Sequence, residues 1–207
     1  MPSSHLNWSS DECCHWEGIT CDRAGRSPIY HWPLKASNSI ISGGLGMCSK
    51  LCIFRAGHNN LFGVLPDDIY NATKIEEISL FQNSLNGISE SIANVTNLNI
   101  LNFNFNQLSG MLPRSVGKLS KLELLLLQFN HLNSSFPSSL MNCTNLSELV
   151  LNYNRLTGVI SKLNFSKLSQ LTILDLGNNF LSGIIPTSIC ETNLQSSSHY
   201  YICSATT

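Results

Sequence analysis

The chain has 207 residues, of which only 12% are charged, and its formal net charge is −1. Such a balance creates no field that would attract nucleic acid or an anionic membrane, so we expect neither as a partner. No secretory signal precedes His5, and no apolar run approaches the roughly 20 residues that a membrane helix needs.

Residues 1–22 carry the run NWSSDECCHWEGITCD. This run is similar to the N-terminal cap of plant leucine-rich repeat receptors, which commonly ends in CCxWxGITCD. The resemblance implies a partial cap with a disulfide between Cys14 and Cys21. It also leaves Cys13 without a partner, because the family pairs that cysteine with one in an upstream helix that this sequence lacks. A metal site is the weaker alternative, since adjacent cysteines do not form the usual CxxC chelate.

Residues 23–47 match no repeat, so we expect an irregular segment there. Two cysteines follow it, Cys48 and Cys52. They either pair with each other or remain thiols, because a spacing of four residues decides nothing.

Residues 48–190 repeat one motif, LxxLxLxxNxLxGxIP, six times at spacings of 23 to 25 residues. A period of this length predicts a leucine-rich repeat solenoid, an α/β fold in which each turn contributes one short strand. The copies begin at Leu51, Ile75, Leu98, Leu122, Leu146 and Leu171. Six copies exceed the three or so that stability requires.

One asparagine in each copy follows the apolar strand pair by three residues. A carboxamide both donates and accepts, so stacked asparagines can satisfy backbone groups where the chain leaves each strand. We interpret these asparagines as structural and not as ligand-binding: Asn59, Asn83, Asn106, Asn130, Asn154 and Asn179.

The second half of the motif, LxGxIP, occurs as LFGVLP, LSGMLP and LSGIIP. Glycine gives the backbone freedom at a bend, and proline ends the donor capacity of the strand that follows. This signature marks the plant-specific class of leucine-rich repeats. Three copies depart from it: repeat two is one residue short after Gly87, Ser134 replaces glycine and Ser161 replaces proline.

A closer resemblance rests on five runs of the array. They are FRAGHNNL from Phe54, IYNATKIEEISL from Ile69, VGKLSKL from Val116, NCTNL from Asn142 and FSKLSQLTILDLGNN from Phe165. These runs resemble tyrosine-sulfated glycopeptide receptors, relatives of the phytosulfokine receptors. The resemblance implies a receptor whose repeat ectodomain precedes a membrane helix and a Ser/Thr kinase, although this chain contains no kinase motif.

Residues 191–207 continue no repeat, so we interpret them as an aberrant tail of a longer, truncated gene. Cys190 and Cys203 receive no pairing. Seven Asn-x-Ser/Thr sequons fit a glycosylated protein in an oxidising, extracellular setting: Asn7, Asn71, Asn94, Asn133, Asn142, Asn145 and Asn164.

Catalysis is not expected. The six histidines lack HExxH spacing, and no GxSxG, Walker or GxGxxG motif occurs. We therefore expect no cofactor and no metal.

Recognition is expected on the concave face, where equivalent strand positions align in columns roughly 4.8 Å apart. Outward residues of repeats three to five are the candidate ligand-binding set: Asn102, Asn104, Phe105, Leu126, Gln128, Phe129, Val150, Asn152 and Tyr153. Alternation forces Leu126 and Val150 outward. The aromatic residues either contact a ligand or only cover the next rung.

Three functions remain open at this stage. The first is a non-catalytic module of a plant receptor-like kinase or receptor-like protein that binds a secreted peptide or a partner ectodomain at the plasma-membrane face. The second is an inhibitor resembling polygalacturonase-inhibiting proteins. The third is a gene fragment without activity.

Overall fold

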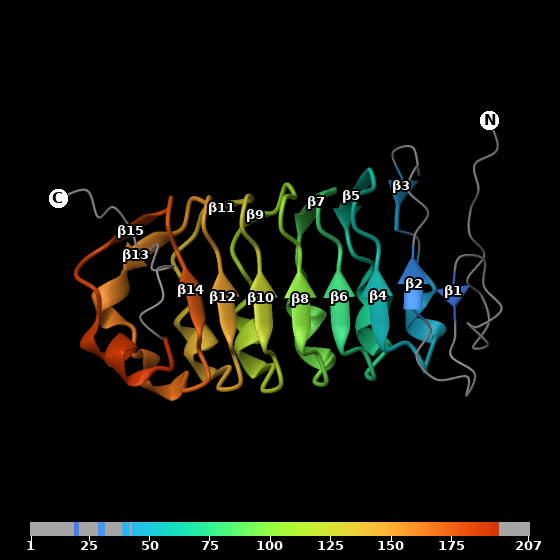
Figure 1. Cartoon of the computed structure of the whole chain (residues 1–207). Coiled ribbons are helices and arrows are strands. Elements are labelled where there is room, and N and C mark those ends of the chain that lie inside the picture. The colour runs from blue at the N-terminus through green and yellow to red at the C-terminus, as the bar shows by residue number, and fades with distance from the viewer. Residues whose placement is uncertain (1–18, 21–28, 32–38, 42, 195–207) are drawn as a thin grey trace.

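The main sheet runs the length of the array. The computed structural model describes residues 19–20, 29–31, 39–41 and 43–194. Its eight-stranded sheet has the order β1, β2, β4, β6, β8, β10, β12, β14 (Figure 1). The strands are β1 (Ile19–Thr20), β2 (Ile29–His31), β4 (Ile53–Arg55), β6 (Glu77–Ser79), β8 (Ile100–Asn102), β10 (Leu124–Leu126), β12 (Glu148–Val150) and β14 (Ile173–Asp175). All pairings from β2 onward are parallel, and only β1 runs antiparallel to its neighbour.

A second set of short strands follows one edge of the array, and from β5 onward these strands come from the LxGxIP half of the motif (Figure 1). They are β3 (Ser39–Ile40), β5 (Leu61–Val64), β7 (Ser84–Gly87), β9 (Ser109–Gly110), β11 (His131–Leu132), β13 (Thr157–Val159) and β15 (Phe180–Ser182). The departures predicted from the sequence break this edge. The β5–β7 register shifts beside the shortened repeat, and a single bridge from Ser135 to Thr157 spans repeat four, where serine replaces glycine. The main sheet keeps its register throughout.

Short 3-10 helices form the side opposite the main sheet (Figure 1). They are η2 (Leu45–Met47), η3 (Asp67–Asn71), η4 (Glu90–Asn94), η5 (Arg114–Lys118), η6 (Ser138–Asn142), η7 (Ile160–Lys162), η8 (Phe165–Lys167) and η9 (Thr187–Glu191). Neighbouring turns are tied together here as well. The Glu90 carboxylate of one turn accepts hydrogen bonds from the Arg114 and Ser115 amides of the next, at 3.2 and 3.1 Å.

The core is one continuous apolar cluster between the main sheet and the helices. All six residues that begin the repeats are fully buried, which confirms the period predicted from the sequence. Cys143 belongs to this core as a free thiol, and its Sγ lies 3.4 Å from the Val116 carbonyl oxygen. Burial raises the pKa of this thiol to about 11, so it stays protonated and unreactive at neutral pH.

Residues 23–47, expected to be irregular, contain parts of a further turn. β2 pairs in parallel with β4, β3 pairs with β5, and η2 packs against η3. Ile29 aligns with Ile53, which is one repeat period further along the chain. The leucine pattern did not predict this turn because the segment has no asparagine at the position equivalent to Asn59 and no LxGxIP signature.

The expectation for Cys48 was wrong. Cys48 is disulfide-bonded, whereas Cys52 is a free thiol, so the two do not pair with each other and Cys48 is not a thiol. Cys13, Cys14, Cys21 and Cys203 lie outside the described residues, and the pairing of Cys14 with Cys21 stays a prediction.

Buried asparagines join successive turns into a ladder. Asn106 is typical of the five from Asn83 to Asn179. Its Nδ2 donates to the Leu80 carbonyl of the preceding turn and to the Phe103 carbonyl of its own turn, at 2.9 and 3.2 Å. Its Oδ1 accepts from the Leu85 amide at 2.9 Å. This geometry confirms the structural role predicted for these residues.

Replacement of one ladder asparagine tests how much the ladder contributes to the stability of the array. Asn130→Ala leaves the Leu108 amide and two carbonyl groups of residues 103 and 127 without their side-chain partner. We expect the free energy of unfolding, measured by urea titration, to fall by about 3 kcal/mol, because buried unpaired groups carry their desolvation penalty. The control is Asn97→Ala, whose side chain bonds Thr73 and Lys121 at an exposed site. Equal losses in the two variants would contradict a stabilising role specific to the ladder.

Candidate binding site

The residue before each ladder asparagine has a left-handed backbone. The φ angles lie between 51° and 56° at His58, Gln82, Phe105, Phe129, Tyr153 and Asn178. This conformation costs an L-residue roughly 1–2 kcal/mol. The strain recurs in every turn because the chain must bend out of the strand and still aim the next asparagine inward. As a result, one side chain per turn is displayed at the end of each main-sheet strand.

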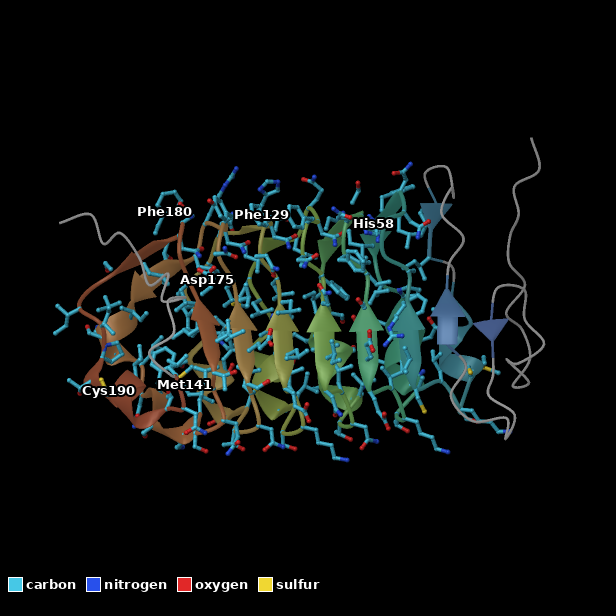
Figure 2. The ribbon with its side chains drawn as sticks, viewed as in Figure 1. His58, Phe129, Met141, Asp175, Phe180 and Cys190 are labelled. Carbon is cyan, nitrogen blue, oxygen red and sulfur yellow. The ribbon has the colours of Figure 1, made fainter. Side chains whose placement is uncertain are left out.

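Three of these displayed residues form a stack. Phe105 and Phe129 have ring centroids 4.3 Å apart and planes inclined by 11°, and Phe129 and Tyr153 are 4.4 Å apart at 10°. These centroid distances are close to the spacing of neighbouring strands, so the register of the main sheet brings the rings into a parallel stack. We call these three residues the aromatic stack. Figure 2 shows Phe129 near the ends of the strands, beside the second set of strands.

The stack remains open to solvent. Phe105, Phe129 and Tyr153 are 45%, 38% and 49% exposed. Their inner faces cover one another, as one of the two interpretations proposed, while their edges stay free for contact. A shallow hollow of about 390 Å³ lies against the stack, bordered on its other side by Gln107 and His131. His131 Nε2 and Gln107 Oε1 lie 3.0 Å apart, so the two side chains form a polar rim.

A row of carboxamides lies on the other side of the stack. It consists of Asn104, Gln128 and Asn152, which are half-buried on three adjacent turns. Their side-chain oxygens are buried and have no hydrogen-bond partner within the described residues. Buried acceptors of this kind are costly unless a partner is supplied, and a ligand can supply one only if these carboxamides turn their oxygens outward.

Aliphatic side chains continue the site toward the middle of the strands. Leu126 pairs with Val150 across β10 and β12, and both are half-buried on the outer surface of the main sheet. We call this surface the strand face; it is the surface termed concave in the sequence analysis. Leu124 and Ile100 lie side by side two residues earlier on their strands. These residues form an apolar floor beside a hydrogen-bonding row, and the outward orientation predicted for Leu126 and Val150 is confirmed.

Toward the N-terminal repeats the candidate site ends, because the aromatic and charged side chains there contact one another. Gly57 leaves room for the Phe81 ring, because a Cβ at residue 57 would approach that ring to 2.4 Å. Phe81 also contacts His58 edge-on, with ring centroids 4.7 Å apart. Below them, Arg55 forms a two-point ion pair with Glu77 at 2.7 and 2.6 Å. These contacts pair the aromatic and charged groups of repeats one and two with each other.

Toward the C-terminal repeats the strand face is acidic. Asp175 ends β14, as Figure 2 shows, and its Oδ1 accepts a hydrogen bond from the Gly177 amide at 3.0 Å. Partial burial raises the pKa of this carboxyl, and the Gly177 hydrogen bond opposes the shift. Glu148 lies on the adjacent strand, half-buried and without a salt bridge among the described residues.

The structure brings the nine predicted residues together on three adjacent turns. Asn102 also belongs to the set, and its Oδ1 accepts from the Asn104 amide at 3.3 Å. Sequence reasoning missed Ile100 and Leu124, although the same alternation, extended two residues toward the start of each strand, predicts them. It also missed Gln107 and His131, which follow the ladder asparagine. Ligand binding by any of these residues remains a prediction.

The sequons within the described residues are all exposed. Three of them, Asn71, Asn94 and Asn142, are the last residues of η3, η4 and η6. The others are Asn133, Asn145 and Asn164, and Asn7 lies outside the described residues. Attachment of a glycan requires an accessible side chain, so these positions permit modification, which stays a prediction.

Two absences apply to the described part of the chain. None of its helices has the length and apolar character of a membrane span. It also contains no group of three or more His, Cys, Asp or Glu residues arranged to hold a metal ion.

Comparison with known proteins agrees with this geometry. One leucine rich repeat family model matches residues 134–196, and another matches residues 97–119. The chain is also 27% identical over 89 residues to phytosulfokine receptor 1 of Arabidopsis thaliana, covering 42% of this chain and 9% of the receptor. The chain folds as a leucine-rich repeat solenoid and resembles plant receptor ectodomains. The resemblance to phytosulfokine receptors stated from the sequence is thereby confirmed.

Solved structures show the same similarity. A plant peptide hormone receptor, RGFR1 in complex with RGF2, is 31% identical and superimposes with a TM-score of 0.73 over 86% of this chain and 28% of its own. The Arabidopsis HAESA ectodomain with an IDA peptide is 28% identical, with a TM-score of 0.63, over 75% of this chain and 30% of its own. The chain therefore spans less than a third of these two receptors.

Substitution of the central ring tests the strain beneath the stack. At a φ of 56°, Phe129→Gly removes both the ring and the left-handed penalty, whereas Phe129→Ala removes only the ring. We expect the glycine variant to be more stable by about 0.5–1 kcal/mol, after the extra entropy of glycine in the unfolded chain is counted. The control pair is Gln128→Gly and Gln128→Ala, because residue 128 has no positive φ and alanine should be favoured there. Thermal unfolding that ranks alanine above glycine at both positions would contradict the account.

Proposed function

We propose that this chain is a non-catalytic, extracellular recognition module of a plant receptor-like kinase or receptor-like protein, and that it binds a secreted peptide in extended form. The single observation that carries the proposal is the combination on three adjacent turns of an exposed aromatic stack, unused carboxamides and an aliphatic floor. Aromatic groups beside hydrogen-bonding side chains are typical of interfaces.

An extended peptide fits these chemical groups better than a folded domain with a flat surface does. Its backbone offers a donor and an acceptor at every residue, which can use the row of Asn104, Gln128 and Asn152. Its side chains alternate in direction, so those on one side can reach Leu126 and Val150 while those on the other remain in solvent. Two similar structures support this class of ligand: RGFR1 is a peptide hormone receptor solved in complex with RGF2, and the HAESA ectodomain was solved with an IDA peptide hormone ligand.

Peptide selection provides the test. The glycosylated protein is immobilised and panned against a displayed library of random 12-residue peptides, and enriched peptides are then synthesised and titrated. We expect Leu126→Glu and Phe105→Ala to weaken their binding about tenfold or more, because centrally buried contacts dominate the affinity of an interface.

Two controls make the result specific. Ile184→Glu changes an equally apolar residue that is 80% exposed near the second set of strands and away from the strand face, and it should leave affinity unchanged. Thermal unfolding of each variant checks that the array is intact. The proposal fails if no peptide is enriched above panning on the Leu126→Glu protein, or if Ile184→Glu weakens binding as much as Leu126→Glu does.

A further inference from the structure

The charges of the strand face are distributed unevenly along the array. Within the described part of the chain, the strands of the main sheet carry one cation with a described side chain, Arg55, and its guanidinium is already held by both oxygens of Glu77. The two carboxylates at the other end, Glu148 and Asp175, have no such partner among the described residues. On the strands of the main sheet, an incoming ligand therefore meets a neutral ion pair in repeats one and two and two carboxylates without a salt bridge in repeats five and six.

The residues just before the start of each repeat add to the difference in charge between the two ends of the array. The residue just before the start of each repeat is a lysine in repeats one, two and four and an amide in repeats three, five and six: Lys50, Lys74 and Lys121 against Asn97, Asn145 and Gln170. Lys121 also lies two residues from Glu123 and so offsets its charge. No lysine occupies the equivalent position in the repeats of Glu148 and Asp175. The cations that these two repeats do carry, Arg155, Lys162 and Lys167, lie outside the strands of the main sheet, so β12 and β14 themselves present negative charge only.

The two carboxylates alternate with aliphatic side chains. In the β12–β14 register, Glu148 lies opposite Ile173 and Val150 lies opposite Asp175. The aliphatic neighbours continue onto β10, where Leu124 lies opposite Glu148 and Leu126 lies opposite Val150. Each carboxylate thus borders apolar surface, where a partner charge is desolvated and interacts more strongly than in open water.

We infer that the ligand of this face is an extended polypeptide segment carrying both aliphatic and basic side chains, with a lysine or arginine seated between Glu148 and Asp175. The inference rests on the function proposed above, and it adds the chemical class of the ligand and the direction of its charge. The aliphatic side chains contact Leu126 and Val150, and the cation lies one to two strands further toward the C-terminal end of the array.

The test uses the peptides enriched on the unmodified protein and a paired set of variants. Glu148→Gln with Asp175→Asn removes both charges and keeps the side-chain shapes, and asparagine at residue 175 retains the acceptor for the Gly177 amide. We expect enriched peptides to carry net positive charge, and their affinity to fall about fivefold or more in this double variant. Affinity for the unmodified protein should also weaken as the salt concentration rises from about 0.05 M to about 0.5 M, because screening acts on partly exposed charge pairs.

Charge reversal supplies the sharper comparison. Panning on Glu148→Lys with Asp175→Lys should enrich acidic peptides instead of basic ones. The matched control is Asp67→Lys, an exposed residue of η3 on the opposite side of the array, which should leave the selected composition unchanged.

The outcomes separate this inference from the proposed function. Peptides that depend on Leu126 but show no charge preference, and that bind the double variant with unchanged affinity, overturn the inference and leave the proposed function standing. Peptides that do not depend on Leu126 overturn the proposed function itself. Basic peptides that depend on both Leu126 and the two carboxylates support the inference.

Discussion

The carboxamide of each ladder asparagine joins the backbone of two turns, and the remaining architecture depends on that joint. A solenoid has no single globular core, since each turn buries its leucines only against its neighbours. Where the chain leaves a strand, its amide and carbonyl groups have no sheet partner, and Asn83 to Asn179 supply one in every turn. This regular joint keeps the strands in register even where the second set of strands is interrupted at repeat four.

The same asparagine joint explains the position of the surface proposed for recognition. To aim the asparagine inward, the preceding residue adopts a left-handed backbone, and its side chain is carried to the rim of the sheet. Aromatic residues at this position in three successive turns stack on one another, because the strand spacing is little more than the thickness of a ring. The strained backbone therefore lies at the residues whose side chains are displayed at the rim. Strained backbone residues often cluster at functional sites.

Much of the repeat fold and of the candidate site could be predicted from the sequence, because the positions of the leucines and asparagines indicate which side chains are buried. Alternation placed Leu126 and Val150 outward, and one period placed Phe105, Phe129 and Tyr153 on adjacent turns. Other features depend on what the pattern does not encode. The turn around β2 and β3 lacks the motif, the disulfide of Cys48 depends on spatial proximity, and the pairing of Arg55 with Glu77 depends on side chains 22 residues apart meeting across two strands.

A crystal structure of the array with one selected peptide bound tests the central claim most directly, since that claim concerns the place and form of the ligand. The account predicts an extended peptide lying across β8 to β14, with side chains on Leu126 and Val150 and backbone groups at the carboxamides of Asn104, Gln128 and Asn152. A peptide bound to the 3-10 helices, or to the strands of the second set around Phe62 and Val64, would contradict it.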